Sequence, residues 1–163
     1  MDKLVDLKTL NLTIQGLRQE GKTIVLANGC FDLIHVGHIR YLKEAKELGD
    51  ILVVALNSDS SVRRLKGEGR PHMEERERAA LLSSLSCVDY LIIFSEGNVE
   101  HILRTLRPGY HAKGSDYTED TVPERETVLE YGGKIAITGG PKVRSTSEVL
   151  KNIEKKTGPA SRQ

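Results

Sequence analysis

The stretch of sequence that decides the fold is Asn28-Gly-Cys-Phe-Asp-Leu-Ile-His35-Val-Gly-His38. It follows an apolar run at residues 23–27, which predicts a buried strand, and it precedes a helical pattern at 39–48. Two histidines three positions apart therefore lie where a strand ends and a helix begins. The first N–H groups of a helix have no partner within it, so such a junction binds anions, and histidines add donors that can be charged near neutral pH. The stretch predicts phosphate chemistry.

Strands and helices alternate along the rest of the chain. Strands are predicted at residues 23–28, 51–57, 90–94, 109–112 and 134–137. Helices are predicted at residues 7–20, 37–48, 74–85, 98–107, 123–131 and 145–154. The run at 51–56 is continuously apolar, which is typical of a central parallel strand covered on both faces. The pattern predicts an α/β fold with a doubly wound, mainly parallel five-stranded sheet and helices on both faces. Such sheets bind ligands beyond the carboxyl ends of their strands.

The composition narrows the class of protein. The 163 residues suffice for one domain, predicted at 1–154 with an N-terminal helix within 1–20 and a disordered tail at 155–163. Lys and Arg number 24, Asp and Glu number 23, and Trp is absent, so we expect no nucleic-acid partner. The sequence shows no signal-peptide or membrane-span pattern, and we expect a cytoplasmic protein with no membrane partner. Cys30 and Cys87 are expected to be free thiols, and the place of Cys30 after a strand favours a backbone role.

A basic segment interrupts the alternation. Residues 63–71 hold four cations, two glycines and a proline, which predicts a mobile loop. At a binding crevice such a loop could act as a lid, although an ordinary solvated loop can have the same composition. Just before it, Asp59 is placed to cap a short helix at 61–65, and it could also lie near a ligand.

The histidine pair admits other interpretations. His35 and His38 could bind a metal with Asp32 as the nearest carboxylate, but no third ligand has a suggestive spacing. His38 could instead be a core residue that is hydrogen bonded to the backbone. Gly37 is expected to let the backbone approach a ligand closely.

Four later segments extend the histidine motif: Asn57-Ser-Asp59, Ser61-Val-Arg-Arg-Leu-Lys-Gly67, Lys113-Gly-Ser-Asp-Tyr117 and Arg144-Ser-Thr-Ser147. Together with His35-Val-Gly-His38 they resemble the cytidylyltransferase-like nucleotidyltransferases, and within them the branch of heptose 1-phosphate adenylyltransferases. The resemblance covers residues 1–153 and implies a Rossmann-like fold. Two positions depart from the family pattern, since Ser115 replaces a usual glycine and Arg144 a usual cysteine.

The resemblance implies a role for each matched residue. The catalytic residues would be His35, His38 and Lys66. The nucleotide would be bound by Gly29, Cys30, Phe31, Asp32, Gly37, Asp59, Arg64, Arg78, Ser145 and Thr146. Lys113 and Asp116 would bind the acceptor, because a lysine can meet its phosphate and an aspartate can accept from sugar hydroxyls, although Asp116 could merely cap the turn. Magnesium would be held mainly by the triphosphate, with no metal ligand from the protein.

The implied reaction is the transfer of AMP from ATP to D-glycero-D-manno-heptose 1-phosphate. It would give pyrophosphate and ADP-heptose for lipopolysaccharide or another surface glycan. A cytidylyltransferase acting on glycerol 3-phosphate or another alcohol phosphate is an alternative within the class. A non-catalytic nucleotide-binding module is an alternative outside it. Relatives are often fused to a sugar kinase, and we expect that activity on a separate chain; we also expect a homodimer from the family.

Overall fold

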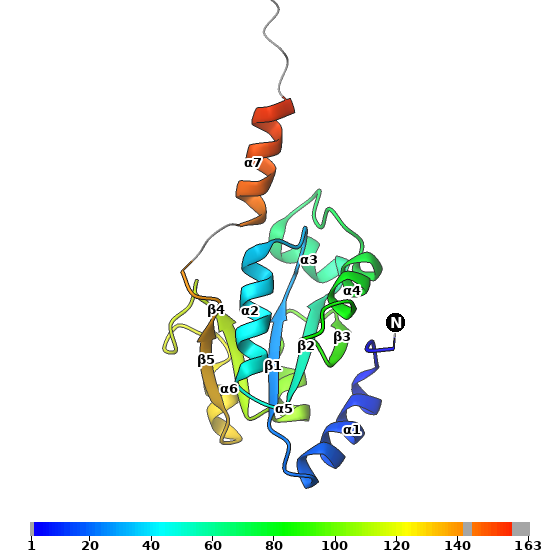
Figure 1. The fold of residues 1–163 in the computed structure, drawn as a ribbon, viewed down its shortest axis with the longest axis vertical. Coiled ribbons are helices and arrows are strands. Elements are labelled where there is room, and N and C mark those ends of the chain that lie inside the picture. The colour runs from blue at the N-terminus through cyan, green and yellow to red at the C-terminus, as the bar shows by residue number, and fades with distance from the viewer. Residues whose placement is uncertain (1, 142–144, 158–163) are drawn as a thin grey trace, which may run out of the picture.

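The computed structural model describes residues 2–141 and 145–157 (Figure 1). Within these residues the core is a five-stranded, all-parallel sheet with the order β3-β2-β1-β4-β5. The strands are β1 (Ile24–Gly29), β2 (Ile51–Asn57), β3 (Tyr90–Phe94), β4 (Tyr110–Gly114) and β5 (Lys134–Thr138). The chain runs outward from β1 through β2 to β3 and then returns to place β4 on the other side of β1. The predicted doubly wound α/β sheet is confirmed, and all its strands are parallel.

Helices cover both faces of this sheet. The helices of the described residues are α1 (Leu7–Gln19), α2 (Val36–Glu47), α3 (Asp59–Lys66), α4 (Glu75–Ser83), α5 (Glu100–Leu106), α6 (Arg125–Glu130) and α7 (Thr146–Thr157), of which α7 packs on neither face. One core cluster contains residues of α2 and α4, and the other contains residues of α1, α5 and α6. No helix in the described ranges has the length and apolar character needed to span a bilayer.

The alternation of side chains along β1 links the two clusters. Val25 and Ala27 pack with α2 and α4, whereas Ile24 and Leu26 pack with α1, α5 and α6. Successive residues of a strand point to opposite faces, so a strand that is covered on both sides must be apolar throughout. The central strand β2 meets this condition, because every residue from Leu52 to Asn57 is buried. This explains why the continuous apolar run in the sequence located β2 correctly.

Two local predictions around α3 were wrong. The helix is capped by Ser58, whose hydroxyl accepts the Ser61 N–H at 3.2 Å, and Asp59 is already the first helical residue. The predicted loop at 63–71 is also shorter, because residues 63–66 form the last turn of α3. The helix ends at Gly67, whose φ of 97° suits a residue without Cβ.

The C-terminal helix differs in length from its prediction. Helix α7 continues to Thr157, so residues 155–157 are helical and were wrongly predicted as tail. Figure 1 shows α7 projecting past the carboxyl ends of the strands, and none of its residues is buried. The rest of the predicted tail, 158–163, and Arg144 lie outside the described residues.

Candidate active site

A cavity of about 640 Å³ lies at the carboxyl ends of the central strands, where the strand order reverses between β1 and β4. Its walls come from the loop after β1, the start of α2, the end of α3, the segment after β4, the end of β5 and the start of α7. The predicted site residues that line it are Gly29, Cys30, Phe31, Asp32, His35, Gly37, His38, Lys66, Lys113, Asp116, Ser145 and Thr146. The volume lies in the range that is common for small-molecule sites.

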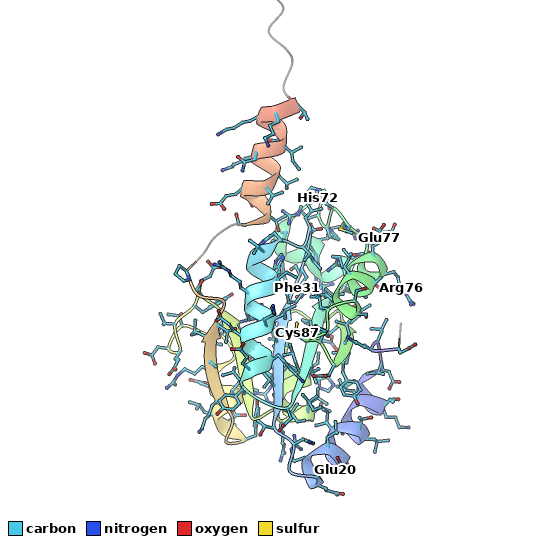
Figure 2. All side chains as sticks on the ribbon, in the orientation of Figure 1. Glu20, Phe31, His72, Arg76, Glu77 and Cys87 are labelled. Carbon is cyan, nitrogen blue, oxygen red and sulfur yellow. The ribbon has the colours of Figure 1, made fainter. Side chains whose placement is uncertain are left out.

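The loop between β1 and α2 carries backbone strain. Phe31 and Leu33 have φ values of 47° and 49°, in the left-handed region that side chains disfavour. Such strain concentrates at functional sites, where the surrounding packing must hold it in place. Here the Phe31 ring is 3% exposed and contacts the rings of His38 and Tyr41, with centroid distances of 5.4 and 6.2 Å. Figure 2 shows Phe31 inside the body of the domain.

The two histidines form the start of α2. His35 is the N-cap residue, and its Nδ1 accepts the Gly37 N–H at 3.1 Å. The Nδ1 of His38 accepts the backbone N–H of His35 at 3.3 Å, and the two rings stack with centroids 3.9 Å apart. Because both Nδ1 atoms accept, each ring in its neutral form carries its proton on Nε2. Gly37 therefore serves the cap as well as lining the cavity.

The protonation state of His38 follows from its burial. Burial, followed by the charge of His35, lowers the pKa of His38 to about 4. At neutral pH the His38 ring is consequently uncharged and offers its Nε2–H as a neutral donor. The sequence pattern left the charge of this donor open, because it does not report burial.

Asp32 anchors the segment that precedes α4. Its carboxylate accepts hydrogen bonds from the Arg70 Nε at 3.1 Å, the His72 N–H at 2.9 Å and the Met73 N–H at 3.1 Å. Burial alone would raise the pKa of Asp32, but these hydrogen bonds and the charge of Arg70 outweigh it and lower that pKa. The carboxylate lines the cavity, yet its hydrogen bonds serve the scaffold.

The start of α7 closes one side of the cavity. The Thr146 hydroxyl donates to the Asp32 carbonyl at 2.8 Å, which fixes the helix start to the loop after β1. Ser145 and Glu148 form a reciprocal cap, with Ser145 N–H to Glu148 carboxylate at 2.9 Å and Glu148 N–H to Ser145 Oγ at 3.2 Å. The N–H groups of Thr146 and Ser147 have no partner within the helix. These groups suit an anion.

A buried cation, Lys113 near the end of β4, also lines the cavity. The Lys113 side chain is 8% exposed, and its Nζ lies 3.6 Å from Glu124 Oε2 and 4.7 Å from the centroid of the Tyr117 ring. Burial lowers the pKa of Lys113, and the Glu124 carboxylate opposes that effect. Asp116 is exposed at the rim of the same wall. A cation held in this way can attract a phosphate at the cavity.

Arg78 lies beneath the cavity rather than in its wall. Its side chain is fully buried and donates to the carbonyls of Cys30 at 2.6 Å, Asn57 at 2.8 Å and Met73 at 3.0 Å. It also donates to the Asp59 carboxylate at 2.6 Å. Neither Arg78 nor Asp59 lines the cavity, and their hydrogen bonds join β1, β2, α3 and α4. A nucleotide contact of either residue stays a prediction.

Arg64 and Lys66, two further residues that the sequence predicts at the site, lie in surroundings that differ from each other. Arg64 is exposed, donates to the Ser95 carbonyl and is absent from the cavity wall. Lys66, at the end of α3, lines the cavity and is exposed. Burial raises the pKa of the Cys30 thiol, and the Cys30 carbonyl accepts a hydrogen bond from Arg78.

Several residues that line the cavity were missed by the sequence predictions: Asn28, Arg70, Tyr117, Thr138 and Gly139. Thr138 and Gly139 directly follow β5, so their place at a carboxyl strand end was a usable signal. A Cβ at Gly139 would lie 3.3 Å from the Tyr41 backbone, which explains the glycine. Asn28 and Tyr117 lie within the sequence motifs, but the motif pattern alone assigns them no role.

The family follows from comparison with known proteins. The family model described as cytidylyltransferase-like matches residues 26–146, which include both histidines and the start of α7. The chain belongs to the cytidylyltransferase-like family. It is a nucleotidyltransferase, and the cavity with its histidine pair is the candidate active site of this cytidylyltransferase-like enzyme.

Individual relatives show which members of the family this chain resembles. The bifunctional protein HldE of Syntrophotalea carbinolica is 48% identical over 136 residues, which make up 83% of this chain and 28% of that protein. HldE of Geobacter sulfurreducens is 45% identical over 156 residues, or 96% of this chain and 32% of that protein. The cytidylyltransferase-like chain thus spans about a third of the length of these curated relatives.

Solved structures agree with the fold. The lipopolysaccharide core biosynthesis protein of Thermoplasma volcanium is 36% identical, with a TM-score of 0.61 over 72% of this chain and 94% of that chain. The pantoate–beta-alanine ligase of Francisella tularensis is 18% identical, with a TM-score of 0.65 over 91% of this chain and 72% of that one. The second likeness concerns the fold alone.

Proposed function

We propose that this enzyme transfers AMP from ATP to D-glycero-D-manno-heptose 1-phosphate and releases pyrophosphate. The observation that carries the proposal is a single cavity with two separate sets of donors. His35 and His38 lie at the start of α2, which packs on one face of the sheet, and Thr146 is hydrogen bonded to the loop just before them. Lys113 also lines the cavity, but its side chain projects from β4 to the other face, because the preceding residue Ala112 packs with α2. Two phosphate-bearing substrates can therefore meet in it. The similarity to HldE proteins and to a lipopolysaccharide core biosynthesis protein supports a heptose phosphate as the acceptor.

The reaction needs alignment more than proton transfer. An oxygen of the acceptor phosphate attacks the α-phosphorus of ATP and forms a new P–O bond. The bond from the α-phosphorus to the bridging oxygen of the β-phosphate breaks, and pyrophosphate leaves with the bonding electrons. Because the acceptor phosphate is already ionised, no strong general base is required. The protein must hold the two groups in line and stabilise charge on the phosphate oxygens.

The hydrogen-bond donors of His35 and His38, at the start of α2, suit that task. His38 remains neutral at physiological pH and donates through Nε2–H, so it would bind a phosphate oxygen without transferring a proton to it. His35 would act beside it, because the two rings are stacked. The backbone N–H groups at the start of α7 would bind a further phosphate. Lys66 would neutralise charge from the end of α3.

Magnesium would enter with the triphosphate and neutralise part of its charge. The donor set of the chain fits that arrangement. Within residues 2–141 and 145–157 no group of three or more His, Cys, Asp or Glu side chains could hold a metal ion. Asp32, the carboxylate nearest the histidines in sequence, is already hydrogen bonded to Arg70 and to two backbone N–H groups. The acceptor itself would be supplied by a sugar kinase.

Pyrophosphate release across a matrix of substrates tests the proposal. ATP, CTP, GTP and UTP would each be paired with the heptose 1-phosphate, with glycerol 3-phosphate and with other sugar and alcohol phosphates. The expected result is strong release from ATP with the heptose 1-phosphate. A His38→Ala preparation that is purified in parallel controls for contaminating enzymes. Strong release from CTP with glycerol 3-phosphate, and none from ATP with the heptose, would favour the cytidylyltransferase alternative.

A further inference from the structure

Asn28 occupies a place in the cavity that has no assigned role. It lies near the end of β1 and is one of the residues that line the cavity. Strands β1 and β4 pair in parallel with Ala27 opposite Ala112, so Asn28 and Lys113 follow side by side at the carboxyl edge. Side chains alternate along a strand, so Asn28, Lys113 and His111 project to the same face of the sheet. Asn28 is therefore the neighbour of the buried cation.

A buried histidine holds the Asn28 amide. His111 is fully buried, and its Nε2 lies 2.9 Å from Asn28 Oδ1. Its other nitrogen, Nδ1, is buried and has no hydrogen-bond partner among the described residues. Burial, and then the charge of Lys113, lowers the pKa of His111 to about 3, so the ring stays neutral at physiological pH. A neutral ring carries one proton, and its place decides which way the amide faces.

Only one placement of the His111 proton and of the Asn28 amide avoids leaving a buried N–H donor without a hydrogen-bond partner. If Nε2 carries the proton, it donates to Asn28 Oδ1, and the bare Nδ1 is merely an unused acceptor. If the amide were reversed, Asn28 would donate to a bare Nε2, and the proton would remain on Nδ1 with nothing to receive it. Buried N–H groups without a partner are rarer and less favourable than unused acceptors. The first arrangement is therefore preferred, and it turns the NH₂ group of Asn28, a residue that lines the cavity, away from His111.

We propose that the Asn28 amide binds the phosphate of the acceptor beside Lys113, and that His111 is the positioning residue that orients it. A neutral NH₂ group next to an ammonium group matches the oxygens of a phosphate. His35 and His38 lie at the start of α2, which packs on the face of the sheet opposite to Asn28 and Lys113. Asn28 therefore lies on the acceptor side. This inference rests on the proposed function, because it details the acceptor side of the same cavity.

Steady-state kinetics of Asn28→Asp and Asn28→Ala test the contact. Both remove the NH₂ donor, and the aspartate adds a charge that repels a phosphate. We expect KM for the acceptor to rise about 10- to 100-fold and KM for ATP to change by less than about threefold. The matched control is Asn98→Asp, because Asn98 is exposed and its Oδ1 caps the Glu100 N–H away from the cavity. An equal rise in both KM values, or no rise in either, would overturn the proposal.

His111 variants test the positioning step. His111→Gln keeps a neutral N–H donor and should retain a near-wild-type acceptor KM, whereas His111→Leu should raise that KM alone. Loss of thermal stability with unchanged KM values would reduce His111 to a structural residue. The acceptor used throughout is the phosphorylated compound that the wild-type enzyme turns over fastest. A different sugar in that place would refute the proposed substrate and leave the test of Asn28 intact.

Discussion

Replacing Arg78 by methionine tests whether this residue holds the scaffold beneath the cavity or contacts the nucleotide. The buried guanidinium donates to three carbonyls and to the Asp59 carboxylate, all of which would lose their partner. Removing one member of a buried ion pair costs about 3–5 kcal/mol. The Asp59 side chain is 29% exposed and can regain water, but the Arg78 hydrogen bond to the Asn57 carbonyl is buried. We therefore expect a loss of about 4 kcal/mol in the free energy of unfolding.

For a chain of this size, that loss corresponds to a fall in melting temperature of roughly 8–16 °C. Differential scanning calorimetry and urea unfolding measure it directly. Arg76→Met is the matched control, because Arg76 lies on the same helix with its side chain at the surface (Figure 2), and it should change the stability by less than about 0.5 kcal/mol. An unchanged melting temperature in Arg78→Met, together with a large rise in KM for ATP, would refute the scaffold role and restore the nucleotide contact.

Three further predictions concern the histidines and the basic segment. His35→Ala and His38→Ala should each lower turnover by roughly two to three orders of magnitude, with a smaller loss of ATP binding, because their donors act on charge that develops in the transition state. Near-wild-type turnover would remove that histidine from the mechanism. Lys66→Ala should lower turnover without changing the melting temperature. Protease cleavage at residues 67–70 should slow when ATP and magnesium are added, because a lid would close over them. Cleavage at the same rate with and without ATP and magnesium would argue against a lid. His38 and His111, whose pKa values are depressed to about 4 and about 3, bind protons only in the unfolded state between pH 6.5 and about 4. The free energy of unfolding should therefore fall as the pH drops through this window, by up to about 1.4 kcal/mol per pH unit for each histidine. Urea unfolding at several pH values measures this slope, and a flat profile would contradict it.

The sequence predicted the fold well because the fold depends on periodic patterns. The apolar run at 51–56 marked the central strand, and helical patterns between the strands required a parallel, doubly wound sheet. That topology places the loop after β1 at the point where the strand order reverses. The sequence therefore predicts the histidine motif, Lys113 and the start of α7 at one edge of the sheet, and all three line the cavity.

The failures share a different cause. Ser58 and Asp59 are both good caps, and the choice between them depends on the geometry of one turn. Arg78 has charged neighbours on its helix, so only the tertiary packing shows that it is buried. The neutral state of His38 follows from burial. The contact of Asn28 with His111 joins positions 83 residues apart through the pairing of β1 and β4.

Following the oxygen atoms of the acceptor phosphate tests the central claim most directly. The enzyme would receive unlabelled ATP, magnesium and heptose 1-phosphate that carries heavy oxygen throughout its phosphate, and mass spectrometry would follow the products. If the acceptor phosphate attacks the α-phosphorus, ADP-heptose should retain all of the heavy oxygen and the pyrophosphate should carry none. Label in the pyrophosphate, or release of ADP and orthophosphate without a nucleotide sugar, would contradict the account.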